Sequence, residues 1–346
     1  MTFFNKFLDN IVHQREAEED DSFEVRGKKP EYHGTIVPYP NFRPRMDASV
    51  LEEAINGKNV DEETIITLLV QRTNEQRQEI AVAYEKSTDK SLVKELKSEL
   101  RSDLEDVILG LMLTPAQFDA FLLRKATKGL GTSEDILTEV LTSRTNKQIK
   151  DLARAFEEEN GKSLEDVIKK ETKGDFTQAL LAMLEAKKDE SHTVNPVLAR
   201  KDALTLFESS EESDGIDVSV FIDILTSRNG PQLAQTFKSY SKMSDVNLPK
   251  ALDMHLKGDI EDCLIDIVKC AWSTPAFFAE KLHNAMKGHG TCEYTLMRVL
   301  VSRSEVDLKR IVDEFQAMYG KPLQECILED TKGHFENILL RLCGPV

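Results

Sequence analysis

Acidic residues and turn-like loops recur along this chain in one fixed register. Arginine marks the register at four equivalent positions, which are Arg72, Arg144, Arg228 and Arg303. Loops end 12 residues before these arginines, at Val60, Thr132, Ile216 and Thr291, and the residues 27 positions after them are Glu99, Glu171, His255 and Asp330. A loop that aims carbonyl oxygens at one centre, together with a distant carboxylate, is the ligand set of a hard cation such as calcium. The register therefore predicts a calcium-type site that was built once and then copied.

Two of the four loops, at residues 128–132 and 287–291, read K-G-x-G-T. Glycine reaches positive φ without a steric penalty, so alternate carbonyls of such a loop can point to one ion. Three carbonyls and a bidentate carboxylate supply about five of the six to eight oxygens that calcium takes, which leaves room for water or an outside phosphate. One such loop is weak evidence, whereas two copies with an acid at the same offset are strong evidence. The chain has no D-x-D-x-D-G loop of the EF-hand type, and the order of lysine and glycines excludes a P-loop.

The composition limits the classes of function. The chain has 346 residues, a formal net charge of −16 and five cysteines. This charge argues against nucleic acid as a partner, since phosphate binding needs clustered lysine and arginine, and it opposes contact with an anionic membrane unless cations intervene. No stretch reaches the ~20 apolar residues that span a bilayer, and the N-terminus does not read as a signal peptide. The irregular cysteines indicate neither a disulfide framework nor a zinc site, so a reducing cytosol is the expected compartment.

Hydrophobic periodicity predicts an all-α chain of four repeats, each with about four or five short helices. The arginines are 72, 84 and 75 residues apart, and the long middle interval contains a polar connector with a proline. We expect repeats at residues 42–113, 114–185, 197–269 and 273–344, with a linker at 186–196 and two repeats on each side of it. The arginines themselves are expected to form buried ion pairs rather than to bind metal.

Residues 1–41 differ from the repeats. An apolar stripe at helical spacing predicts a short amphipathic helix, and an acidic tether rich in helix breakers follows it. The stripe consists of Phe3, Phe4, Phe7, Leu8, Ile11 and Val12. Such a helix either packs on the protein's own core or docks into a partner's groove or onto lipid, and the sequence leaves both open.

The K-G-x-G-T loop with an acid 39 residues after its threonine, in a register that covers residues 42–344, resembles the annexin family. The resemblance implies a slightly curved disc of four five-helix repeats, with calcium sites on the convex face and the N-terminal segment on the concave face. The ligands that it implies in repeat two are Thr127, Gly129, Gly131, Thr132 and Glu171. Those that it implies in repeat four are Met286, Gly288, Gly290 and Asp330.

Repeats one and three depart from the family pattern. Repeat one keeps Glu99, but Asn59 and Val60 replace the second glycine and the threonine, and asparagine tolerates the left-handed region better than most residues. The smaller sites implied there consist of Asn59, Val60 and Glu62, and of Lys97, Leu100 and Glu105. In repeat three His255 replaces the acid, and the ligands left are Ser210, Ser213, Gly215 and Asp253. Imidazole suits softer metals than calcium, so we expect this site to be weak or empty.

The predicted function is calcium-dependent binding of anionic phospholipid membranes, with calcium shared between open sites and lipid phosphates. The resemblance implies further roles in membrane aggregation, exocytosis, phospholipase A2 inhibition and inflammation, and an EF-hand partner for the N-terminal helix. It also implies a cytoplasmic protein that is peripheral on plasma and endosomal or vesicle membranes, with nuclear pools and extracellular pools by non-classical release. The alternatives are a helical-repeat interaction scaffold that needs no lipid and, ranked last, an enzyme, because no nucleophile, base and orienting group can be placed together.

Overall fold

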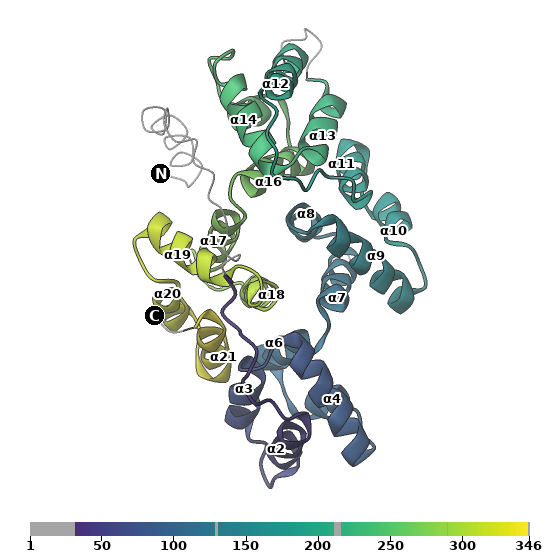
Figure 1. Ribbon diagram of the computed structural model, residues 1–346, viewed down its shortest axis with the longest axis vertical. Coiled ribbons are helices and arrows are strands. Elements are labelled where there is room, and N and C mark those ends of the chain that lie inside the picture. The colour runs from purple at the N-terminus through teal and green to yellow at the C-terminus, as the bar shows by residue number, and fades with distance from the viewer. Residues whose placement is uncertain (1–31, 129–130, 211–215, 289, 345–346) are drawn as a thin grey trace. The chain divides into compact units, whose positions relative to one another are not determined.

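The computed structural model describes residues 32–128, 131–210, 216–288 and 290–344, and the predicted amphipathic helix near the N-terminus lies outside them. Within the described residues the chain forms twenty α-helices and no strand (Figure 1). The helices fall into four successive groups of five, which confirms the prediction of an all-α chain of four repeats with about five helices each. None of these helices combines the length and the apolar character that crossing a bilayer requires.

The five helices follow one another in the same order in every repeat. Repeat one consists of α2 (Pro44–Asn56), α3 (Glu62–Val70), α4 (Asn74–Thr88), α5 (Leu92–Glu99) and α6 (Ser102–Met112). Repeat two consists of α7 (Pro115–Thr127), α8 (Glu134–Ser143), α9 (Asn146–Asn160), α10 (Leu164–Glu171) and α11 (Gly174–Leu184). Repeat three consists of α12 (Pro196–Ser210), α13 (Val218–Ser227), α14 (Gly230–Tyr240), α15 (Leu248–His255) and α16 (Asp259–Trp272). Repeat four consists of α17 (Thr274–Ala285), α18 (Glu293–Arg303), α19 (Leu308–Tyr319), α20 (Leu323–Asp330) and α21 (Gly333–Cys343).

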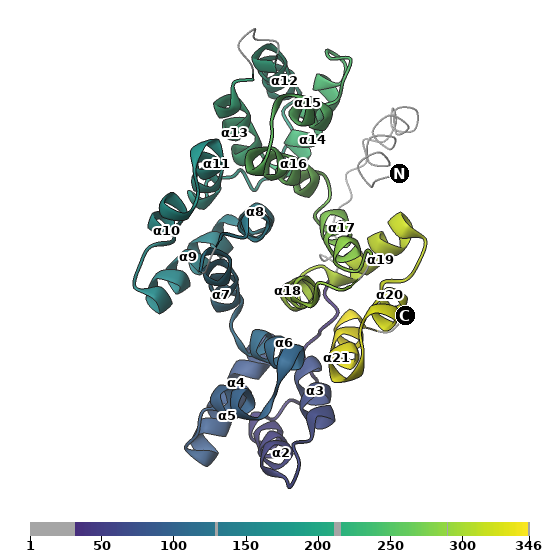
Figure 2. The ribbon, with the colours of Figure 1, turned by 180° about the vertical axis from the view of Figure 1, so that it is seen from behind.

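The helices form two compact units that combine repeats distant in the sequence. One unit, with residues 119–277, holds most of repeats two and three, and the other, with residues 27–118 and 278–346, holds most of repeats one and four. The boundaries fall inside α7 and α17. In the first unit α8 packs against α16, and α11 packs against α13; in the second unit α6 packs against α18, and α3 packs against α21 (Figures 1 and 2). Each unit therefore buries apolar helix faces of two repeats against each other.

The predicted linker between repeats two and three lies inside the first unit, rather than between the two units. The side-chain amide of Asn146 brackets the linker backbone, because its Nδ2 donates to Lys188 O at 2.7 Å and its Oδ1 accepts from Lys188 N at 3.2 Å. The next residue, Asp189, donates its N–H to Ser227 O at 2.8 Å. These bonds join the linker to repeats two and three, so its polar composition does not mark a boundary between compact units.

In repeats one, two and three the residues around the arginine end the second helix and begin the third. Thr73 and Gln76 form a reciprocal capping box at the start of α4, and Thr145 and Gln148 form the same box at the start of α9. In repeat three the side chain of Asn229 accepts a hydrogen bond from the third residue of the following helix. Each cap satisfies backbone N–H groups that have no partner within the helix. The polar residues directly after the arginine are therefore helix caps in these three repeats.

Three of the four arginines form a two-pronged ion pair with an aspartate in the first helix of their own repeat. The pairs are Arg72 with Asp47 at 2.6 and 3.0 Å, Arg144 with Asp119 at 2.8 Å twice, and Arg228 with Asp202 at 2.8 and 3.2 Å. The residues of the first two pairs are buried, which confirms the predicted buried ion pairs. The planar guanidinium matches both carboxylate oxygens, so the pair pins the first helix to the end of the second.

Repeat four holds its arginine in a different way. Phe278 occupies the position of the aspartate, and its ring centre lies 4.7 Å from Arg303 Cζ. Arg303 instead forms a two-pronged pair with Asp307, with both contacts at 2.7 Å. Arg303 is 4% exposed, and a buried guanidinium needs a counter-charge. The aspartate lost from α17 is thus replaced by one at the start of α19.

The end of the predicted tether is attached to the unit of repeats one and four. The backbone N–H groups of Thr35 and Ile36 donate to Ser304 O at 2.8 and 3.2 Å. The side-chain amide of Gln76 bonds both backbone groups of Tyr39, at 3.0 and 3.1 Å. Ile36 is buried. The folded part of the chain therefore begins before α2, and the expected tether does not extend to residue 41.

Replacing Asp119 by alanine should destabilise the protein by about 3–5 kcal/mol, because the buried Arg144 then keeps its charge without a partner. Urea unfolding measures this change. Asp151→Ala is the matched control, since Asp151 pairs with the exposed Lys147 and Arg154, and exposed pairs contribute at most about 1 kcal/mol. Similar losses in the two variants would show that the buried pair does not stabilise the repeat.

Candidate metal centres

The loop between the first and second helix is closed by one backbone hydrogen bond in each repeat. In each bond a backbone N–H at the end of the loop donates to a backbone carbonyl of the first helix. The bonds run from Asp61 to Ala54 (2.9 Å), from Ser133 to Ala126 (2.8 Å), from Asp217 to Ser209 (3.2 Å) and from Cys292 to Ala285 (2.8 Å). The bond spans seven residues in repeats one, two and four, and eight in repeat three. The longer loop of repeat three also explains why its Arg–Asp pair is 26 residues apart, whereas the pairs of repeats one and two are 25 apart.

Each acid position is the last residue of the fourth helix of its repeat. Glu99 ends α5, Glu171 ends α10, His255 ends α15 and Asp330 ends α20. Three residues later the backbone passes through positive φ, with 56° at Ser102, 63° at Gly174, 74° at Gly258 and 68° at Gly333. A residue at positive φ thus follows the fourth helix at the same spacing in all four repeats.

A threonine hydroxyl joins the loop to the acid in repeats two and four. Thr132 Oγ1 donates to the backbone carbonyl of Glu171 at 3.3 Å. Thr291 Oγ1 lies 3.1 Å from the backbone carbonyl of Asp330 and 3.4 Å from its carboxylate Oδ2. The 39-residue spacing in the sequence is therefore a spatial contact that brings loop and carboxylate together.

The described glycines of these two loops adopt conformations that other residues rarely take. The angle φ is 138° at Gly131, 104° at Gly288 and 111° at Gly290, and a Cβ built on any of them would meet no atom within 4 Å. Thr127 ends α7 and Met286 directly follows α17, so both stand at the start of a loop. Gly129 lies outside the described residues. Glycine is needed here for the turn of the backbone, and the space around the turn is open.

The donors present in repeats two and four fit a hard cation. Among the described residues no group of three or more His, Cys, Asp or Glu side chains could hold a metal ion. Any metal at these loops would therefore take most of its ligands from backbone carbonyls, together with the one carboxylate that ends the fourth helix. Calcium accepts such an all-oxygen set, whereas zinc prefers sulfur and nitrogen.

Repeat one lacks the features of these loops. Asn59 does not adopt positive φ, so the suggestion that it replaces glycine in the left-handed region is wrong. Gly57 is also at negative φ, with φ −62° and ψ 171°. Val60 has no hydroxyl group that could bond the acid. The Glu99 carboxylate accepts from the neighbouring Ser98 hydroxyl at 3.3 Å instead.

The smaller sites expected in repeat one are engaged by neighbouring side chains. The Glu62 carboxylate lies 3.2 Å from His334 Nε2. The Leu100 carbonyl accepts from Arg101 Nη1 at 2.6 Å. The other expected ligands are Lys97 in the last turn of α5 and Glu105 in the first turn of α6. Calcium at these oxygens would have to compete with the contacts that His334 and Arg101 already make.

Repeat three brings few of its expected ligands together. Ser210 is buried at the end of α12, and its hydroxyl donates to the carbonyl three residues earlier at 2.7 Å. The expected ligands Ser213 and Gly215 lie outside the described residues. Lys250 donates to the Asp253 carboxylate at 2.7 Å, and this bond holds the pKa of Asp253 below its usual range. His255 stands exposed at the acid position.

Two contacts at the acid positions were not found by sequence reasoning. Lys170 Nζ lies 2.8 Å from Glu171 Oε1, and the hydrogen bond to Glu171 raises the pKa of Lys170. In repeat one, Arg101 also bonds the Ser98 carbonyl at 2.6 Å. Both basic residues stand within two positions of an acid in the sequence, so they could have been noticed there. The repeated spacing of loops and acids does not include these neighbouring positions.

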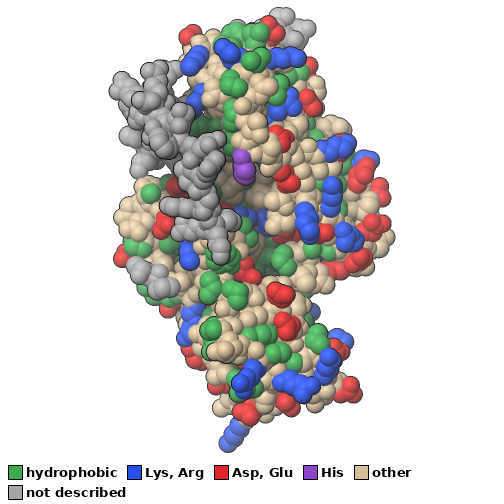
Figure 3. Space-filling model, viewed as in Figure 1, with side chains coloured by type: hydrophobic (Ala, Val, Ile, Leu, Met, Phe, Trp, Pro, Cys, Tyr) green, Lys and Arg blue, Asp and Glu red, His purple; other side chains and the backbone are tan. Residues whose placement is uncertain are grey.

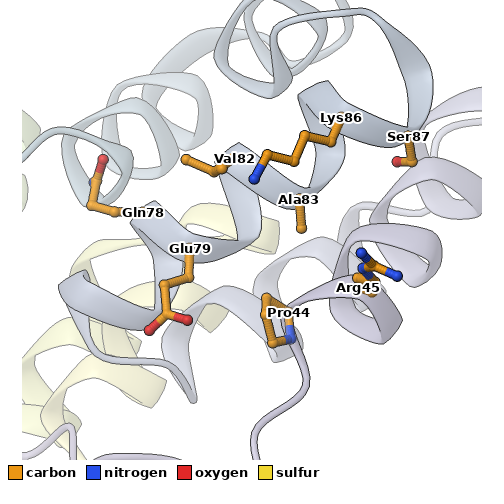
Figure 4. Close-up of a pocket in the computed structure, with 8 residues that line it drawn as sticks. All are labelled: Pro44, Arg45, Gln78, Glu79, Val82, Ala83, Lys86 and Ser87. Carbon is orange, nitrogen blue, oxygen red and sulfur yellow. The ribbon is translucent and has the colours of Figure 1, made fainter.

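Repeat one also carries a surface groove of about 700 Å³ between α2 and α4 (Figure 4). Arg45 comes from α2, and Lys86 comes from α4 together with Val82 and Ala83. The eight residues that line the groove include none of the predicted calcium ligands. The groove is therefore separate from the candidate metal centre of this repeat.

Comparison with known proteins covers almost the whole chain. The Annexin family model matches residues 46–111, 118–183, 201–267 and 277–342. Annexin A1 from Rattus norvegicus and Annexin A1 from Homo sapiens are each 48% identical to the chain over 344 residues, which are 99% of this chain and 99% of each relative.

Solved structures agree with the sequence matches. The structure of annexin III has a TM-score of 0.89 at 43% identity and covers 91% of this chain and 98% of its own. Calcium-bound annexin (Sm)1 has a TM-score of 0.82 at 31% identity, with 91% and 94% covered. The four matched segments coincide with the four groups of five helices, each with its loop and acid position. The chain belongs to the annexin family.

Proposed function

We propose that this protein binds anionic phospholipid membranes reversibly, as a peripheral protein, through calcium held in the loops of repeats two and four. Annexin membership implies calcium-dependent phospholipid binding and a non-enzymatic protein. The observation that carries the proposal for this chain is the contact of the Thr291 hydroxyl with Asp330, beside glycines at positive φ. That arrangement gives a metal both carbonyl and carboxylate oxygens at one place.

The proposed ligands come from backbone and side chain together. In repeat four they are the carbonyls of Met286, Gly288 and Gly290 and the carboxylate of Asp330. In repeat two they are the carbonyls of Thr127, Gly129 and Gly131 and the carboxylate of Glu171, with Thr132 holding the loop. These groups supply about five of the six to eight oxygens that calcium takes, so a bound ion would keep positions for lipid phosphate and reverse the local charge.

The charge of the protein makes a metal necessary for the proposed contact. The net charge of −16 opposes approach to an anionic leaflet. Figure 3 shows basic and acidic side chains interspersed over α9 and α10, rather than gathered into one basic patch. In the proposed contact the attraction comes from cations held at the loops, so chelation of calcium releases the protein.

The four repeats are proposed to differ in strength. Repeat one has its acid but no loop glycine at positive φ, and its smaller sites compete with Arg101 and His334. Repeat three has an imidazole at the acid position and a loop longer by one residue. We rank both below repeats two and four.

Finer roles are proposed from the 48% identity to Annexin A1. They are phospholipase A2 inhibition by covering the lipid, membrane aggregation, a role in exocytosis, and regulation of inflammation. The apolar stripe of residues 3–12 is proposed to bind an EF-hand protein or a second membrane. The proposed location is the cytoplasm and the plasma and endosomal or vesicle membranes, with further pools in the nucleus and outside the cell.

Neutralising both acids, with Glu171→Gln and Asp330→Asn, should raise the calcium concentration for half-maximal binding to phosphatidylserine vesicles by about tenfold or more. Co-sedimentation at graded calcium measures this, and Glu165→Gln with Glu325→Gln, which lie on the same two helices, is the control for charge. A wild-type chain that does not pellet with vesicles in calcium would instead favour the lipid-independent scaffold.

Gly290→Ala should weaken calcium binding in repeat four several-fold and cost about 1 kcal/mol of stability, because φ is 111° there. Gly320→Ala is the matched control, since Gly320 has φ 71° at the end of α19 and also has open space around it. Calorimetric calcium titration and urea unfolding compare the two. If the two variants weaken calcium binding equally, general backbone strain accounts for the loss, and the conformation of the repeat-four loop does not.

His255→Glu should add one calcium ion per chain at millimolar calcium, because it restores two carboxylate oxygens and a negative charge at the acid position. Calorimetry gives the number of ions. Met254→Glu adds the same charge one residue earlier and should leave the number unchanged. If the His255→Glu chain binds no further calcium ion, the imidazole of His255 is not the reason that repeat three binds calcium weakly.

A further inference from the structure

The residue before the acid position differs in every repeat. The four residues are Ser98, Lys170, Met254 and Glu329. In repeat two the ammonium of Lys170 lies 2.8 Å from Oε1 of Glu171, the proposed calcium ligand. In repeat four the proposed ligand Asp330 follows Glu329 and is contacted by the Thr291 hydroxyl. The two complete sites therefore have opposite charges next to their acids.

We propose that Lys170 restrains calcium binding in repeat two, so that repeat four fills at lower calcium and repeat two responds only at higher calcium. This regulation rests on the proposed function, because it concerns the same two sites. The protein then responds to calcium in two steps instead of filling two equivalent sites together.

The restraint is a competition for one carboxylate. A calcium ion that binds Glu171 through both oxygens needs Oε1, which accepts the hydrogen bond from Lys170. The ammonium therefore has to share this oxygen with the ion or leave it, and in either case its positive charge remains close by on a flexible side chain.

Solvent exposure limits the size of the effect. The side chains of Lys170 and Glu171 are 78% and 30% exposed, and breaking an exposed ion pair changes an equilibrium by a factor of about five at most. Repulsion between the lysine and a divalent ion adds to this, and salt screens both contributions. We expect Lys170 to weaken calcium binding in repeat two by about three- to tenfold.

Repeat four has the opposite arrangement. Its residue before the acid, Glu329, forms an ion pair with Lys321 at 2.5 Å. Lys321 is thereby directed to Glu329 and not to Asp330. The sequence places no lysine directly beside Asp330, whose carboxylate is contacted by the Thr291 hydroxyl at 3.4 Å and not by an ammonium among the described residues.

Lys169 provides a matched control within the same helix. It is adjacent to Lys170 and carries the same charge, but its ammonium contacts Glu165 at 2.5 Å. Removing either lysine changes the net charge of the chain equally. The difference between the two variants therefore isolates the contact with the acid.

The test uses the full chain with Asp330→Asn, which silences repeat four and leaves repeat two to be observed. Lys170→Gln and Lys169→Gln are compared in this background by calorimetric titration with calcium alone, without lipid. Lys170→Gln should lower the dissociation constant about three- to tenfold and Lys169→Gln less than about twofold, and the difference should shrink at high ionic strength. In a Glu171→Gln background, Glu329→Lys should weaken repeat four by a similar factor.

Equal shifts for the two lysine variants would overturn the proposal in favour of a general charge effect. An unchanged or weaker affinity in Lys170→Gln would overturn it directly. Co-sedimentation of the same proteins with phosphatidylserine vesicles separates this result from the proposed function. If calorimetry shows the shift but the wild-type chain does not pellet in calcium, the lipid function fails and the restraint stands; if the chain pellets without a shift, the restraint fails.

Discussion

Repeats one, two and three each depend on the ion pair between the arginine that follows the second helix and an aspartate of the first helix. In repeats one and two this pair is buried and joins residues 25 positions apart. A buried charge without its partner is strongly unfavourable, so the two helices have one stable arrangement. A backbone hydrogen bond then closes the loop between them. The loop carbonyls are therefore aimed by a framework that takes no part in binding the metal.

Framework and site can change independently, because they use different groups. Repeat four has lost the aspartate of the first helix, yet Arg303 finds Asp307 and the loop with its acid remains complete. Repeats one and three show the converse. Their arginines keep their aspartates, while Val60 and His255 remove the hydroxyl and the carboxylate from the site. Four similar repeats thus carry different sets of donor groups, and the proposed ranking of their calcium sites rests on these side chains at the margin of each loop.

Periodicity and spacing predicted the helices, the four repeats and the joining of loop and acid, because all of these arise within one repeat. The predictions that differed from the structure used local preferences. Asn59 tolerates the left-handed region as an isolated residue, but the closed loop of repeat one does not place it there. The polar linker looks like a boundary, yet Asn146 and Asp189 bond it into a compact unit. In each case a hydrogen bond or the closure of a loop decided the conformation, and the amino-acid composition of the segment did not.

The sequence by itself determined the candidate calcium ligands and the repeats in which the pattern of glycines and acids is broken, since glycines, acids and helix caps act over short stretches of chain. Only the tertiary structure decided that repeat two packs with three and repeat one with four, as the contacts of Thr35 with Ser304 and of Arg77 with Glu305 illustrate. These partners are more than 200 residues apart. Pairing of this kind depends on which apolar faces and charges meet once the helices have formed, and no local pattern of residues encodes that choice.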